Sequence, residues 1–134
     1  MDNLRPEGEQ KKIVIVEDDK FLRDLLTKKF SKEGFWVHAA KNGEEGEKFI
    51  YEDAPDIILL DIILPGLDGF EVLERIKKNE KTRNIPVLAL SNLSQKADVD
   101  RAKNLGAEDF MVKSNFTPGE IFRKIKEILA RRYL

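Results

Sequence analysis

The stretch from Pro55 to Gly69 reads PDIILLDIILPGLDG and contains a short apolar run that ends at an acid. The run from Ile57 to Leu60 has no polar residue at alternate positions, which is typical of a strand buried on both faces of a parallel sheet. Asp61 follows at once, at the edge of an open α/β sheet where ligands bind. A lone acid there is more often part of a polar loop, so its meaning depends on what other strands bring to the same edge.

Apolar strands alternate with amphipathic helices along the rest of the chain. We predict strands at Ile13–Val16, Phe35–Ala40, Ile57–Leu60, Val87–Leu90 and Asp109–Val112. Phe35–Ala40 is the most mixed in character and is expected at an edge of the sheet. Five such strand–helix units with right-handed crossovers predict an α/β fold, a doubly wound five-stranded parallel sheet with helices on both faces.

Helix-start and helix-stop signals lie between these strands. The expected N-caps are Asn42, Asp68, Ser94 and Thr117. Three of them have an acid three positions later, namely Glu45 after Asn42, Glu71 after Asp68 and Glu120 after Thr117. Gly34 and Gly106 are expected to end the helices that precede them. Asp68 is therefore interpreted as a helix cap.

Length and composition exclude several classes of site. The 134 residues suit one domain, and the absence of cysteine excludes disulfides and thiolate metal sites. The single histidine, His38, excludes a multi-histidine metal cluster and is expected to be simply exposed on its edge strand. With 24 Lys+Arg against 25 Asp+Glu there is no electrostatic case for direct nucleic-acid binding. No apolar stretch approaches about 20 residues, so we expect a cytoplasmic protein without a membrane span, and residues 1–11 are expected to be a disordered tail.

Polar residues that can bind a metal ion or take part in catalysis follow four of the predicted strands. They are Glu17 and Asp18 with Asp19, then Asp61, Ser91 and Lys113. Because the carboxyl ends of parallel strands share one edge, these groups are expected to converge in one crevice. Crowded carboxylates need a cation, and an oxygen-only set favours magnesium. A carboxylate beside magnesium can attack phosphorus, while a lysine and a hydroxyl bind the phosphoryl oxygens.

The whole set resembles the receiver domain of two-component response regulators, including its single-domain, chemotaxis-regulator-like members. The matching motifs are IVIVEDD, PDIILLDIILPGLDG, VLALS and GAEDFMVK, and the resemblance covers essentially all of residues 12–132. It implies a flavodoxin-like (βα)5 fold with strand order 2-1-3-4-5, and a receiver domain over residues 12–134.

The resemblance also assigns roles by position. It makes Asp61 the phospho-acceptor and Asp18 a direct Mg2+ ligand, with Glu17 acting through water and the Ile63 backbone carbonyl as a further ligand. Lys113 pairs with the phosphoryl group, and Ser91 binds it. Phe110 stands at the position of an aromatic switch residue that moves with the Ser91 hydroxyl.

The resemblance further implies a signalling phospho-acceptor whose only chemistry is autocatalytic phosphoryl transfer and self-dephosphorylation. The donor is a phosphohistidine of a sensor histidine kinase or a phosphotransfer protein. The phosphoryl group then switches the surface of the fourth helix, fifth strand and fifth helix for a downstream protein, or for a homodimer. The predicted elements extend to the end of the sequence, so we expect output through a separate protein partner.

Two positions depart from the family pattern. Ser114 stands where proline usually follows the lysine, so a trans peptide bond and a different path for the next residues are expected. Asn92 stands where a very small residue is preferred, which narrows the approach to Asp61. These departures keep open a pseudo-receiver that is never phosphorylated and acts only as an interaction module. An aspartate-nucleophile phosphatase is disfavoured, because Ile63 stands where its second Asp is expected.

Overall fold

The computed structural model describes residues 10–93 and 95–132. The strands are β1 (Lys12–Val16), β2 (Trp36–Ala40), β3 (Ile57–Asp61), β4 (Val87–Ser91) and β5 (Asp109–Val112). The helices are α1 (Lys20–Lys32), α2 (Gly43–Asp53), α3 (Gly69–Lys78), α4 (Lys96–Asn104) and α5 (Pro118–Arg132), and a 3-10 helix, η1 (Lys113–Asn115), precedes α5. Strands and helices alternate as predicted.

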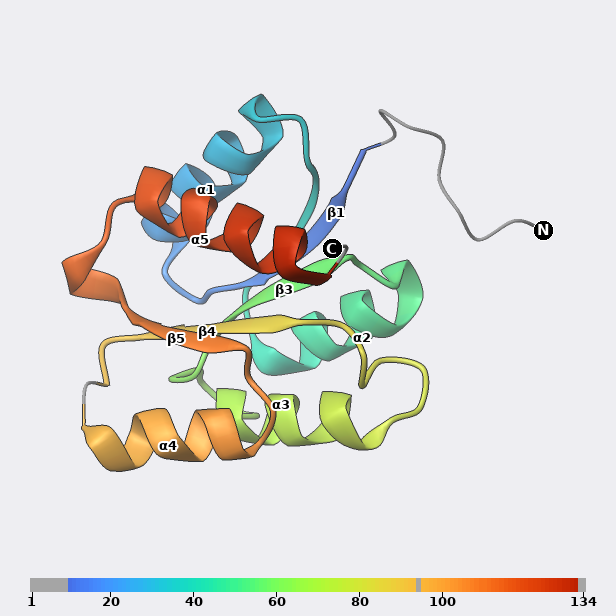
Figure 1. Cartoon of the computed structure of the whole chain (residues 1–134), viewed down its shortest axis with the longest axis vertical. Helices are drawn as coiled ribbons and strands as arrows, with labels where there is room; N and C mark the ends of the chain where they lie inside the picture. The colour runs from blue at the N-terminus through green and yellow to red at the C-terminus, as the bar shows by residue number, and fades with distance from the viewer. Residues whose placement is uncertain (1–9, 94, 133–134) are drawn as a thin grey trace.

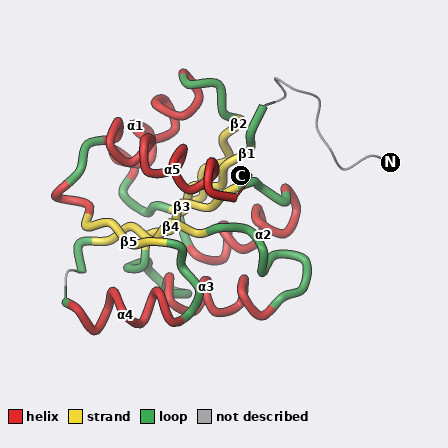
Figure 2. The backbone as a smooth tube through the Cα atoms, in the orientation of Figure 1, coloured by secondary structure: helices red, strands yellow, loops and turns green. Residues whose placement is uncertain are grey.

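All five strands are parallel and form one sheet in the order β2-β1-β3-β4-β5. The flavodoxin-like topology predicted from the sequence is therefore confirmed, and β2 lies at an edge as expected. Helices α1 and α5 cover one face of the sheet, and α2, α3 and α4 cover the other (Figure 1). The same three layers can be followed in the backbone trace, where the strands run through the middle (Figure 2).

The sheet separates two hydrophobic cores, because successive side chains of a strand point to opposite faces. Ile13 and Ile15 of β1 pack with Phe30 of α1 on one side, whereas Val14 and Val16 pack with helices α2 and α3 on the other. Every residue of β3 and β4 is buried. Burial on both faces explains why these strands are continuous apolar runs.

Most predicted helix ends are found. The side chains of Asn42 and Asp68 accept the N–H groups of Glu45 and Glu71 at 2.8 and 3.0 Å, and Thr117 forms a reciprocal capping box with its partner glutamate. Gly34 and Gly106 follow their helices with φ of +94° and +110°. The predicted cap Ser94 lies outside the described residues; Gln95 occupies the N-cap position of α4 without a side-chain bond to the helix.

The predicted tail, residues 1–11, falls largely outside the described residues. Lys11, which is described, accepts the Trp36 N–H through its carbonyl oxygen at 2.9 Å. The only histidine, His38, was expected to be simply exposed, but it lies 2.6 Å from Asp53 through Nδ1 and stacks on Phe49. Within residues 10–93 and 95–132, no helix has the length and apolar character needed to span a membrane.

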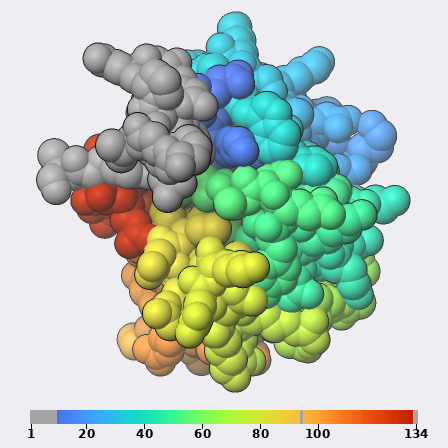
Figure 3. Space-filling model, turned by 90° about the vertical axis from the view of Figure 1, so that its right-hand side faces the viewer, coloured from blue at the N-terminus to red at the C-terminus, as the bar shows by residue number. Residues whose placement is uncertain are grey.

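The segment between α3 and β4 closes the end of the sheet at which the strands begin. Thr82 is buried, and its hydroxyl donates to the carbonyl oxygen of Ile76 at 2.7 Å. The ammonium of Lys77 donates to the carbonyl oxygens of Ile85 and Arg83 at 2.7 and 3.1 Å. Figure 3 shows this segment in yellow beside the green α2. These bonds hold the segment that leads into β4 against α3.

Gly69, the first residue of α3, lies against the backbone that follows β3. A Cβ atom added there would overlap the carbonyl oxygen of Asp61 and the Cα of Ile62. Its own N–H donates to the carbonyl oxygen of Ile62 at 2.9 Å. Only a residue without a side chain lets α3 begin so close to Asp61.

We therefore expect Gly69→Ala to lower the free energy of unfolding by about 1–3 kcal/mol, because backbone atoms must move to admit the methyl group. This loss should appear although alanine ordinarily favours a helix interior by about 1 kcal/mol. Gly119→Ala in the first turn of α5 is the matched control, since its nearest neighbour would be 3.8 Å away. Urea denaturation of both variants tests this, and Gly69→Ala at wild-type stability would contradict it.

Candidate functional site

The carboxyl ends of β1, β3, β4 and β5 meet at one edge of the sheet and enclose a small crevice. Register places Val16 beside Leu60, and Ser91 beside Val112, so the residues that follow these strands are neighbours. The crevice has a volume of about 300 Å³ and is lined by Asp18, Asp19, Asp61, Ile63, Ser91, Asn92 and Lys113. The structure thus brings together the residues that the sequence predicted to converge.

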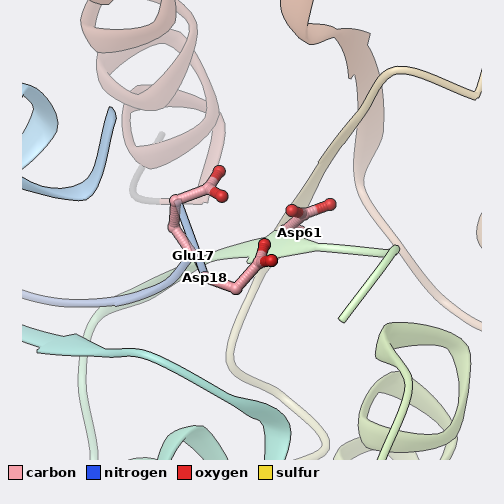
Figure 4. Close-up of side chains that lie close together, drawn as sticks. All are labelled: Glu17, Asp18 and Asp61. Carbon is pink, nitrogen blue, oxygen red and sulfur yellow. The ribbon is translucent and has the colours of Figure 1, made fainter. Parts of the chain in front are cut away.

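Three acids face one another in this crevice. Carboxylate oxygens of Glu17, Asp18 and Asp61 all lie within 4.8 Å of one another. Figure 4 shows Glu17 and Asp18 at the end of β1 and Asp61 at the end of β3. Glu17 is 1% exposed and Asp61 is 3% exposed, whereas Asp18 is exposed. Two carboxylates are therefore held out of water beside a third that remains accessible.

Lys113 supplies the positive charge that these acids require. Its Nζ lies 2.7 Å from Asp61 Oδ2 and 2.7 Å from Glu17 Oε1, and it also donates to Glu17 Oε2 at 2.9 Å. The lysine side chain is only 15% exposed. An ammonium shared by two buried carboxylates leaves the pocket with a net negative charge, which attracts a cation.

Backbone groups orient the same carboxylates. The Ile63 N–H donates to Asp61 Oδ1 at 3.0 Å, and the Asp19 N–H donates to Glu17 Oε2 at 3.0 Å. The guanidinium of Arg23 donates to the carbonyl oxygens of Glu17 and Asp18 at 2.9 and 3.2 Å. The turn after β1 is thereby fixed from the first helix, and the acids keep one orientation.

Burial shifts the pKa values of the acidic side chains in the pocket. It raises the pKa of Glu17 to about 7, and the nearby charge of Asp61 adds to this, while Lys113 and the Asp19 N–H act in the opposite direction. Burial likewise raises the pKa of Asp61 above its ordinary value. Burial disfavours the charge of Lys113, but its hydrogen bonds to Asp61 and Glu17 outweigh this and raise its pKa.

Ser91 and Phe110 occupy different surroundings. Ser91 is fully buried at the end of β4, and its Oγ accepts the Leu93 N–H at 3.2 Å. Phe110 lies on β5 opposite Ala89 and packs, half-buried, against the core on the side of α2, α3 and α4. Ser91 thus lines the crevice, while Phe110 lies behind it, next to the layer that contains α4.

The sequence placed Asp19 among the converging acids but did not reveal that it also caps α1, nor that Arg23 contributes to the site. Asp19 lines the crevice and caps α1 through its side chain, which accepts the Leu22 N–H at 3.3 Å. No acid stands three positions later to signal that cap. The role of Arg23 could not be predicted from the sequence, because its side chain binds backbone carbonyl oxygens, which every residue has. The lysine–serine peptide bond is trans, as expected, since no described residue has a cis bond.

Comparison with known proteins identifies the family. The model of the response regulator receiver domain matches residues 13–126. The chain belongs to this family. The receiver domain is similar to a CheY-like receiver domain protein of Methanospirillum hungatei, with 27% identity over 93% of this chain and 98% of that one and a TM-score of 0.86.

Two further solved structures are similar to this receiver domain. The signal receiver domain of a signal transduction histidine kinase from Syntrophus aciditrophicus has 30% identity over 90% of each chain and a TM-score of 0.80. The BeF3-activated N-terminal receiver domain of RstA from Klebsiella pneumoniae has 28% identity over 89% of this chain and 98% of that one, with a TM-score of 0.80. Such domains belong to two-component systems.

The acidic pocket of this receiver domain fits magnesium. All of the acidic donors are carboxylate oxygens, which are the ligands that Mg2+ prefers. Glu17 Oε1 is buried and faces Lys113 without a hydrogen bond of acceptable angle among the described residues. An incompletely satisfied buried oxygen next to two further carboxylates is suited to a cation.

The raised pKa values predict how stability depends on pH in magnesium-free buffer. The folded receiver domain binds a proton at Glu17 more tightly than the unfolded chain does, so the contribution of Glu17 is complete below pH 4.5 and is lost as the pH rises through about 7. We expect the free energy of unfolding to fall by about 2 kcal/mol between about pH 5 and about pH 8, a value reduced for water entering the open crevice.

Glu17→Gln should flatten this fall, because glutamine does not titrate. Urea titrations of both proteins across that pH range, in the presence of a chelator, measure the difference. Glu45→Gln is a suitable control, since that acid lies on α2 outside the crevice. An equal pH dependence in wild type and Glu17→Gln would contradict the shift assigned to Glu17.

Proposed function

We propose that this receiver domain accepts a phosphoryl group on Asp61 from a phosphohistidine of a sensor histidine kinase or phosphotransfer protein. One observation carries the proposal: Asp61 is a buried carboxylate held 2.7 Å from the ammonium of Lys113 and within 4.8 Å of two further acids. A structural aspartate has no need of such neighbours, whereas phosphoryl transfer depends on positioning and on neutralising charge.

The transfer of the phosphoryl group from histidine to Asp61 needs no reactant other than these two groups. An oxygen of the Asp61 carboxylate attacks phosphorus, the bond from phosphorus to the histidine nitrogen breaks, and the imidazole leaves with that electron pair. The product is an acyl phosphate on Asp61. Later attack of water on phosphorus releases inorganic phosphate and restores the carboxylate, so the protein is a signalling phospho-acceptor whose turnover is limited to its own phosphoryl group.

The other crevice residues take supporting roles in this proposal. Asp18, Asp61 and the Ile63 backbone carbonyl would hold Mg2+, with Glu17 acting through water. The ion supplies positive charge that neutralises the phosphoryl oxygens when it is bound. Lys113 adds a second positive charge on the same group, and the Ser91 hydroxyl donates to one of its oxygens.

The phosphoryl group would switch the α4–β5–α5 surface through Ser91 and Phe110. Ala102 is the one residue of α4 that is fully buried, and the Arg101 guanidinium lies 4.0 Å from the centre of the Phe70 ring. A helix with so few apolar anchors is easily displaced. We assign this surface to a downstream protein, or to a second copy of the chain in a homodimer.

Exposed apolar side chains on the segments that follow β1, β3 and β5 form an apolar rim that suits a protein donor. It consists of Phe21 and Leu25 on α1, Ile63 after β3, and Phe116 after η1, which are 74%, 39%, 54% and 38% exposed. Phe21 and Phe116 each lie three residues from a crevice residue, Asp18 and Lys113. Exposed large apolar side chains clustered beside a reactive group mark a protein contact. We assign this apolar rim to the phosphodonor protein.

Phosphorylation by a small phosphodonor such as acetyl phosphate tests the central proposal. With Mg2+ present, intact mass should show one added phosphoryl group on wild type and none on Asp61→Asn, and a chelator should suppress the reaction because the acids then repel the donor. Asp68→Asn is the matched control, since Asp68 caps α3 and asparagine caps equally well.

Two outcomes would reject that proposal in favour of its alternatives. Wild type that takes up no phosphoryl group under any condition would indicate a pseudo-receiver acting only as an interaction module. Rapid turnover of phosphate esters would indicate a phosphatase.

If the apolar rim binds the donor protein, a substitution in it should affect transfer from a protein donor but not from a small-molecule donor. Phe21→Ala should slow transfer from a phosphorylated histidine phosphotransfer protein about tenfold, because a central aromatic contact is lost. Labelling by acetyl phosphate should be unchanged, since the crevice is intact. Tyr51→Ala is the control, as this residue is 40% exposed but lies on α2 near the opposite end of the sheet. Equal slowing with both donors would place Phe21 in the chemistry instead.

A further inference from the structure

A hydrogen bond joins the residues that follow two reactive positions. Asn92 comes directly after Ser91, and Ser114 comes directly after Lys113. The Ser114 N–H donates to Asn92 Oδ1 at 3.2 Å across a separation of 22 residues. The bond therefore links the ends of the neighbouring strands β4 and β5 at the crevice (Figure 1). We call it the Asn92–Ser114 latch.

The latch needs both of the residues at which the sequence departs from the family pattern. A very small residue at position 92 has no side-chain acceptor, and a proline at position 114 has no N–H to donate. Proline at 114 would also disfavour a helical conformation at Lys113, which is the first residue of η1. The two departures are thus parts of one contact.

The latch acts on residues already placed in the crevice. Asn92 lines it together with Asp61, Ser91 and Lys113. Because Ser91 and Lys113 precede the two partners of the bond, the segments that carry them are held at a fixed separation. The Asn92 side chain thus forms part of the crevice lining beside the ends of β4 and β5.

We propose that Asn92 is a positioning residue: bonded to Ser114, it restricts the access of small phosphodonors and of water to Asp61. This inference rests on the phospho-acceptor role proposed above. Asn92 and Ser114 are both exposed, and the bond is neutral. A bond of this kind favours the closed arrangement about fivefold, so the latch sets a rate and does not block the site.

The test separates the hydrogen bond from the bulk of the side chain. Asn92→Leu keeps the size of residue 92 but removes the acceptor, Asn92→Ala removes both, and Ser114→Ala retains the backbone donor as the matched control. The probes are labelling of wild type and variants with acetyl phosphate and Mg2+, loss of the phosphoryl group after the donor is removed, and backbone amide relaxation by NMR on the unphosphorylated proteins.

We expect Asn92→Leu and Asn92→Ala to gain and lose the phosphoryl group about fivefold faster than wild type, and Ser114→Ala to match wild type. Amide relaxation should report greater motion at Leu93, Ser114 and Asn115 in the first two variants alone. Asn92→Asp, which keeps an acceptor oxygen, should restore the wild-type order at Ser114.

Other outcomes would overturn the inference. If Asn92→Leu matches wild type while Asn92→Ala is faster, bulk alone controls access. Equal rates in all the labelled proteins would show that the bond is an incidental surface contact, and the phospho-acceptor role would stand. Wild type that takes up no phosphoryl group would overturn the proposed function, and the role of the latch with it.

Discussion

The ammonium of Lys113 lies 2.7 Å from two buried carboxylates that come from different strands. Without this ammonium, Glu17 and Asp61 would lack a cationic partner in a buried position, and an unpaired buried charge is costly. Strand β4 lies between β3 and β5, so the lysine must reach across β4 to meet Asp61. A long side chain that directly follows the edge strand β5 thus balances charges that originate near the centre of the sheet, and the strand order and the pocket depend on each other.

Local sequence patterns were enough to predict the layers of the fold. The apolar runs of β1, β3 and β4 are buried on both faces, so their lack of alternation was informative. Asn42, Asp68 and Thr117 make the predicted caps because a cap is formed by residues three positions apart. Convergence of the acids, Ser91 and Lys113 also followed from topology, since parallel strands end at one edge. Their chemical roles remain predictions.

Contacts that have no signature in local sequence patterns could not be predicted in this way. The guanidinium of Arg23 binds carbonyl oxygens, and these leave no trace in residue type. His38 was expected to be simply exposed, but its partner Asp53 lies 15 residues away on another element. Asn92 and Ser114 each depart from the family pattern, yet only the structure shows that they are bonded to each other. Long-range pairing depends on how loops pack, which periodicity does not encode.

The two positions of the Asn92–Ser114 latch differ in how well they tolerate mutation, because the acceptor is a side-chain atom and the donor is a main-chain group. Substitution of residue 92 by any residue without a side-chain acceptor removes the bond, whereas at residue 114 proline alone removes the donor. Evolutionary drift can therefore change position 114 widely without altering the contact, provided that proline is avoided, while position 92 carries the selectable choice. A single codon would then set the signal lifetime of such a receiver, leaving the charged residues of the pocket untouched.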